Sequence, residues 1–151
     1  MEFVNADLIA GALSPFSPDR AAFRAGRLML EQIHLCADRH VDFGFETTLS
    51  GRGYVRLLRS LKDRGYSIDI ALERIAGRVK MGGHNVPKDV VRRRYQKGLS
   101  NFSKLYRPLA DFWAIYDNST HTPHLIAYKE YDKLEIIDHE TFNRISNDME
   151  G

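Results

Sequence analysis

Short apolar runs alternate along the chain with stretches in which apolar residues recur every three or four positions. The runs are rich in aromatic and β-branched residues, which predicts strands. They lie at residues 2–5, 43–49, 66–70, 112–117, 124–128 and 133–137. The run at 66–70 is at the short end of normal strand length and continues without a break into a helical pattern.

The stretches of helical period carry start and stop signals. Ser17 as N-cap followed by Pro18 predicts a helix start, and Gly65 predicts the end of the next helix. The expected helices begin at Pro18, near Tyr54, near Leu72, at Pro87 and near Thr141. Strands that alternate with helices require crossover connections, so the pattern predicts a mainly parallel sheet.

Polar side chains follow three of the predicted strands. Asn5 and Asp7 come after the first, residues 46–48 end the second, and residues 117–119 follow the strand at 112–117. Ligands of parallel sheets bind at the carboxyl ends of the strands. The three clusters therefore predict one shared site at that edge.

Composition narrows the class of protein. The 151 residues suit one domain, and 43% hydrophobic with 28% charged residues is typical of a soluble globular protein. A net charge of +2 gives no reason to expect nucleic acid. Cys36 is the single cysteine, which excludes an internal disulfide framework and makes a zinc site improbable. No apolar run reaches the ~20 residues of a membrane helix and no signal peptide is visible, so we expect a cytoplasmic protein.

Two groups of side chains could carry chemistry at the strand ends. Asp7 could accept a proton from a substrate hydroxyl, although an Asp after a strand is more often a turn cap. Glu46, Thr47 and Thr48 offer a carboxylate and two hydroxyls, which suit a polyhydroxyl or nucleotide-like ligand. The alternative for these three is a solvated strand edge.

Arginines gather on both sides of Gly82-Gly83. Arg78 precedes the glycines, and Arg92, Arg93 and Arg94 follow them in the first turns of a helix. This arrangement suits a lid that closes on phosphates. Such a pattern is more often a solvated basic face of a helix. Contact with nucleic acid is a third interpretation of these arginines.

The quoted stretches that follow, taken together and in order, resemble the zeta-toxin-like family of P-loop kinases. They are "FVNADLIA", "LSPF", "AGRLMLEQI", "FGFETTLSGRGY", "RVKMGGHNVPKDVVRRRYQKGLSNF", "LYRPLADFWAIYDNS" and "LIAY", and they run from about Glu2 to Tyr128. The resemblance implies a P-loop nucleotide kinase-like fold with a mostly parallel sheet flanked by helices. It also implies transfer of the ATP γ-phosphoryl, with Mg²⁺, to a hydroxyl of a small acceptor such as a UDP-amino sugar.

The resemblance also assigns roles to residues. Asp7 maps to the base that activates the acceptor hydroxyl. The acceptor-binding positions map to Asn5, Glu46, Thr47 and Thr48. Arg78 and either Arg93 or Arg94 map to the arginines that hold ATP phosphates. A toxin of this family pairs with an antitoxin, so an antitoxin-like protein is an expected partner.

Two departures from the family pattern change the expectation. The family begins with a strand and a G-x-x-x-x-G-K-[ST] loop before the counterpart of "FVNAD", and no such motif occurs in these 151 residues. A further shortening is apparent near residues 68–71. We therefore expect a single domain over residues 1–151 with an incomplete P-loop fold, truncated at its N-terminus, and inactive as a kinase in this form. The alternative is a non-catalytic remnant or binding module that contacts an antitoxin-like protein.

Overall fold

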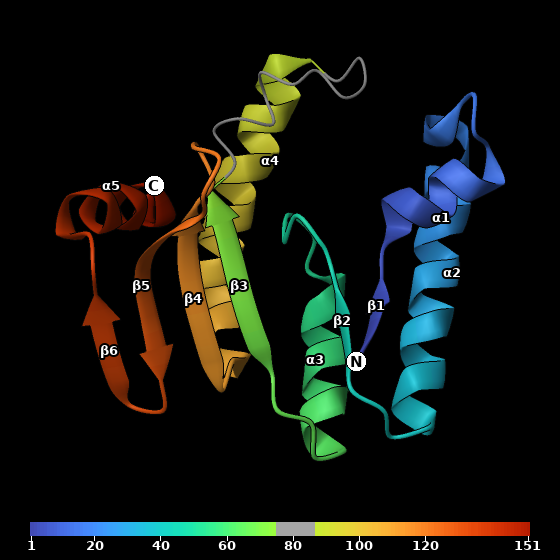
Figure 1. The fold of residues 1–151 in the computed structure, drawn as a ribbon, viewed down its shortest axis with the longest axis horizontal. Helices are drawn as coiled ribbons and strands as arrows, with labels where there is room; N and C mark the ends of the chain where they lie inside the picture. Colours follow the sequence, from blue (N-terminus) through green and yellow to red (C-terminus); the bar gives the residue numbers. More distant parts are fainter. Residues whose placement is uncertain (75–86) are drawn as a thin grey trace. The chain divides into compact units, whose positions relative to one another are not determined.

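The computed structural model describes residues 1–74 and 87–151, which fall into two compact units (Figure 1). The first unit is Met1–Thr47 and the second is Thr48–Gly151. Each is described by itself. No helix in the described ranges is long and apolar enough to cross a membrane. That the chain forms a single domain stays a prediction.

The first unit pairs two short strands and two helices. In chain order these are β1 (Glu2–Val4), α1 (Ala6–Leu13), α2 (Pro18–Asp38) and β2 (Phe43–Phe45). The strands are parallel, with Glu2 opposite Phe43 and Val4 opposite Phe45. The chain passes from β1 through both helices to β2, which is the crossover that a parallel pair needs.

The core of the first unit is built from small side chains. Ala21 and Ala25 of α2 pack with Ala10 of α1, so the two helices can approach closely (Figure 1). Further along α2 the buried residues are Met29, Ile33, Cys36 and Ala37. Ala22 and Leu30, which share the helical spacing of these apolar residues, are exposed. The sequence analysis did not predict α1.

The second unit holds the other elements. They are α3 (Gly53–Asp63), β3 (Asp69–Arg74), α4 (Lys88–Asn101), the π-helical turn η1 (Phe102–Tyr106), the 3₁₀ turn η2 (Arg107–Leu109), β4 (Phe112–Asp117), β5 (His124–Glu130), β6 (Lys133–Ile136) and α5 (His139–Glu150). Its sheet has the order β3-β4-β5-β6. Asp138 begins α5, since its carboxylate accepts a hydrogen bond from the Thr141 N–H at 3.0 Å.

The core of the second unit lies between one face of this sheet and the helices behind it. Trp113 and Ile115 alternate with Ala114 on β4, so they share a face. The ring of Trp113 meets Phe102 of η1 edge to face, with centroids 5.9 Å apart. Figure 1 shows α4, which continues into η1, behind β3 and β4. Trp113 is buried and belongs to this core.

The prediction of a mostly parallel P-loop sheet is wrong. The described residues form two separate sheets, and in the four-stranded one only β3 and β4 are parallel. Strands β4, β5 and β6 form antiparallel pairs. The reason is connection length: the chain between β5 and β6 is only Tyr131 and Asp132, whereas parallel neighbours need a crossover of about a dozen residues.

A second local prediction is wrong at the end of β3. The helical stripe expected from residue 71 does not form over residues 71–74, which continue β3 instead. Residues Asp69–Arg74 lie in unbroken parallel register with Phe112–Asp117, and those ladder hydrogen bonds outweigh the helical spacing of Leu72. The rest of the predicted helix, with Arg78, lies outside the described residues. The predicted end of α3 is confirmed, since Gly65 has φ +89°.

Candidate functional site

Asn5 is the residue that organises the polar end of the first unit. Its Oδ1 accepts hydrogen bonds from the backbone N–H groups of Asp7, at 2.8 Å, and Leu8, at 3.2 Å, so Asn5 is the N-cap of α1. Its Nδ2 donates to Glu46 Oε2 at 3.0 Å. Asn5 thus ties the strand end after β1 to the strand end after β2.

Asp7 lies in the first turn of α1 with its side chain exposed. The alternative that Asp7 is itself the turn cap is excluded, because Asn5 fills that role. Within the described ranges, no recorded hydrogen bond or ion pair occupies the Asp7 carboxylate. The positive end of the helix dipole favours a negative charge at this place. Asp7 is therefore an ionisable group held on an ordered backbone and open to a ligand.

Glu46 is the second carboxylate of this end. It follows β2, is exposed, and is oriented by the Asn5 amide. Because β1 and β2 are parallel, their carboxyl ends reach the same edge, as the sequence predicted for Asn5, Asp7 and Glu46. Thr47 ends the first unit and is exposed too. The strand predicted over residues 43–49 is wrong beyond Phe45, so these side chains extend from a loop.

Thr48 begins the second unit, in the short segment before α3. Its hydroxyl lies 2.8 Å from that of Ser50, and the Ser50 N–H donates weakly to it at 3.4 Å. Three residues that the sequence analysis did not assign to the site, Gly98, Asn101 and Tyr106, hold this segment. The signal that could have found them is the polar Asn101 inside an apolar helical stripe.

The arginines of α4 are all exposed. Arg92, Arg93 and Arg94 occupy successive positions of its second turn, so they point in different directions around the helix. No recorded interaction pairs any of them with a described residue. The choice between Arg93 and Arg94 as a phosphate contact stays open. Arg78 lies outside the described residues.

Cys36 is part of the core of the first unit and is not a nucleophile. Its Sγ donates to Glu2 Oε2 at 3.3 Å, and its side chain lies on the buried face of α2. Burial, and then the hydrogen bond to Glu2, raises the pKa of the thiol. A thiol that resists ionisation is a poor nucleophile.

The metal-ligating side chains of the described residues do not gather into a metal centre. No group of three or more His, Cys, Asp or Glu side chains there could hold a metal ion.

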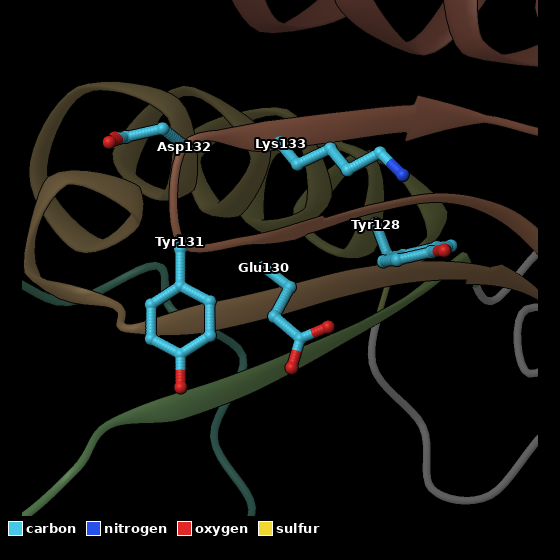
Figure 2. A pocket seen from close by; sticks show the side chains of 5 residues that line it. All are labelled: Tyr128, Glu130, Tyr131, Asp132 and Lys133. Atoms are coloured by element: carbon cyan, nitrogen blue, oxygen red, sulfur yellow. The ribbon is translucent and has the colours of Figure 1, made fainter.

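The hollow at the β5–β6 turn is shallow, and its residues were not predicted to bind anything. It has a volume of about 600 Å³. Figure 2 shows its side chains, which do not converge on one point: Tyr128, Glu130, Tyr131, Asp132 and Lys133. Lys133 is also engaged by Glu135 at 3.0 Å, an ion pair that raises its pKa. These exposed groups make no built site.

The chain is similar to an uncharacterized protein of Haemophilus influenzae (strain ATCC 51907 / DSM 11121 / KW20 / Rd). The two are 32% identical over 102 residues, which cover 61% of this chain and 73% of that protein. No protein-family profile matches the chain. No solved structure matches it either. The chain belongs to the same family as this H. influenzae protein.

Proposed function

We propose that this chain is the acceptor-binding part of a zeta-toxin-like phosphotransferase that works in the cytoplasm. The transferred group would be the γ-phosphoryl of ATP, and the acceptor a hydroxyl of a small molecule such as a UDP-amino sugar. The observation that carries the proposal is the double anchorage of Asn5, which caps the helix that bears Asp7 and also orients Glu46. The sequence resemblance supplies the reaction class.

Asp7 is the group to which we assign proton transfer. Its carboxylate would take the proton of the acceptor hydroxyl while that oxygen forms a bond to the γ-phosphorus. The bond from the γ-phosphorus to the bridging oxygen breaks, and ADP leaves with the electron pair. A positioned base of this kind contributes roughly 10²–10⁴-fold to the rate.

The remaining residues would bind and orient. Glu46 can accept hydrogen bonds from sugar hydroxyls, and Thr47 and Thr48 can donate and accept them. Arg93 or Arg94 would contact phosphate, as would Arg78. ATP and Mg²⁺ enter through the resemblance alone. Since the described residues provide no Mg²⁺ ligand group, no step is assigned to the metal.

The chain as given is proposed to bind an acceptor without turning over ATP. The Gly-rich loop that holds the phosphates in such kinases is absent from the 151 residues. Calorimetric titration with UDP-N-acetylglucosamine tests the binding. Glu46→Gln should weaken it by about tenfold, as expected for loss of a charge-assisted hydrogen bond. Asp19→Asn, in the exposed first turn of α2, is the matched control.

Two results would contradict the proposal. One is that the wild-type chain binds no UDP-N-acetylglucosamine at millimolar concentration. The other is that Glu46→Gln and Asp19→Asn bind it equally well. Mg-ATP-dependent phosphorylation of the sugar by this chain would contradict the claim of inactivity, while it would support the reaction class.

A second candidate function is binding to an antitoxin-like protein. The observation that favours it is the apolar surface of the first unit, where Phe16 is 100% and Phe23 is 81% exposed. Single exposed apolar residues are normal, but two largely exposed Phe side chains near the start of one helix are typical of contact surfaces. Co-purification with the product of the adjacent gene, repeated with Phe16→Ser and Phe23→Ser, tests this. Equal recovery with both variants would exclude the surface.

A further inference from the structure

Leu49 has a backbone conformation that its side chain disfavours. Its φ is +56°, in the left-handed region where a residue with a Cβ is strained, and its side chain is buried. Such a conformation persists only where the surroundings determine it from several sides. Contacts from other parts of the second unit must therefore stabilise residues 48–51.

Asn101 stabilises this segment through two hydrogen bonds of its side chain. Its Nδ2 donates to the carbonyl of Leu49 at 2.8 Å and to the carbonyl of Ser50 at 3.1 Å. Asn101 is 5% exposed, so few water molecules can replace these bonds. Both hydrogens of one amide are thus used on two consecutive carbonyls.

Tyr106 and Gly98 complete the set from the same helical segment. The Tyr106 hydroxyl donates to the carbonyl of Gly51. Burial, followed by the nearby Tyr54, raises the pKa of Tyr106, so the hydroxyl keeps the proton that it donates. At Gly98, an added Cβ would lie 2.5 Å from the carbonyl oxygen of Thr48, so no larger residue fits there.

Three consecutive carbonyls, from Leu49 to Gly51, therefore accept hydrogen bonds from α4 and η1, and the Thr48 carbonyl lies against Gly98. We name this arrangement the loop clamp, formed by Gly98, Asn101 and Tyr106. The arginines predicted to contact phosphate lie on the same helix. Arg93 is eight residues before Asn101, which is about 12 Å along the axis at 1.5 Å per residue.

We infer that Asn101 and Tyr106 are positioning residues, which fix the Thr48 hydroxyl at a set spacing from the α4 arginines. The inference rests on the proposed function for the roles of Thr48 and the arginines. The spacing itself is a property of the second unit and needs no ligand. With Thr48 fixed, an acceptor and a phosphate group would be held in one geometry, which is what phosphoryl transfer requires of a site.

The spacing can be measured by pulsed electron–electron double resonance between spin labels on Arg52→Cys and Arg93→Cys, in a Cys36→Ala background. Both label sites are exposed. Asn101→Leu keeps a similar volume and removes the donors, and it should broaden the distance distribution. Tyr106→Phe removes one hydroxyl and should broaden it less. Gln96→Leu, an exposed amide on α4, is the matched control and should leave the distribution narrow.

A distribution as narrow in Asn101→Leu and Tyr106→Phe as in Gln96→Leu would overturn the inference. Circular dichroism of each variant checks that it is folded; if Asn101→Leu is not, Tyr106→Phe decides. The unlabelled variants are then titrated with UDP-N-acetylglucosamine, for which Asn101→Leu should bind about tenfold more weakly. A broadened distribution with unchanged binding would refute the positioning role. If the wild-type chain binds none, the proposed function fails and the positioning role with it, and the distance data still decide whether the loop clamp exists.

Discussion

Replacing Asn5 separates two contributions that its side chain makes. Asn5→Ala removes the cap of α1 and the bond to Glu46 together, whereas Asn5→Ser keeps a capping oxygen and removes only the bond to Glu46. Loss of an N-cap costs about 0.5–2 kcal/mol of the free energy of unfolding. The bond to Glu46 is exposed, so its own share should be at the low end of the ~0.2–1 kcal/mol measured for exposed charged pairs.

Asn5→Ala should therefore lower stability by about 1–2 kcal/mol, and Asn5→Ser by well under ~1 kcal/mol. In a chain of this size ~1 kcal/mol corresponds to about 2–4 °C in Tm. The assay is thermal and urea unfolding followed by circular dichroism. Both variants should lose affinity for UDP-N-acetylglucosamine, because both free Glu46. Equal stability of Asn5→Ala and Asn5→Ser would refute the capping argument, and unchanged affinity would refute the orienting role.

Three further predictions concern packing and charge. The hydrogen bond from Lys62 to the Asp111 carboxylate, at 2.8 Å, is the main cause of the lowered pKa of Asp111. The stability that this carboxylate adds is present above pH ~3.8 and is lost as the pH falls through the lowered pKa. Asp111→Asn should therefore flatten the fall of Tm below pH 4. Asp111 is about half exposed, so at pH 7 the variant should cost no more than ~1 kcal/mol; an equal fall in both proteins would contradict this. Gly98→Ala should destabilise by about 1–3 kcal/mol in urea unfolding despite the better helix propensity of Ala, because the new Cβ meets the Thr48 carbonyl; a gain in stability would exclude that contact. Cys36 should react with a thiol reagent only as fast as the first unit opens, so rapid labelling in native buffer would contradict its burial.

Local signals predicted the elements whose causes are local. The Ser17-Pro18 start of α2, the end of α3 before Gly65 and the strand "FWAIYD" were all read correctly. The helix α1 was missed because its eight residues are too few to show a clear period. Its start signal was nevertheless present: Asn5 stands immediately before the apolar run, and the sequence analysis assigned the capping to Asp7 instead.

The sheet was predicted wrongly because strand direction is decided by connections and not by strand composition. The runs that form β5 and β6 look alike whether they pair in parallel or antiparallel. The connections distinguish the cases: the link of residues 118–123 between β4 and β5 and the link of Tyr131 and Asp132 between β5 and β6 are both too short for a crossover. The alternation of strands and helices, from which a mainly parallel sheet was expected, does not extend to β4, β5 and β6.

The site residues could be named from sequence, but what holds them could not. Asp7, Glu46 and Thr48 are exposed, and their types and places suggested a ligand site. Their supports are contacts over 41 residues from Asn5 to Glu46 and over 52 residues from Leu49 to Asn101, which no local pattern encodes.

Each unit uses one asparagine for the same physical purpose. Asn5 in the first unit and Asn101 in the second both satisfy backbone groups of a segment that carries predicted site residues. Ordering such a segment costs conformational entropy, which is spent during folding and not at binding. Exposed carboxylates and hydroxyls on backbones that are already ordered can therefore bind a polar ligand without a further ordering cost. The acceptor binding proposed above rests on groups that each unit orders by itself, so we expect it to persist in a chain that transfers no phosphoryl group.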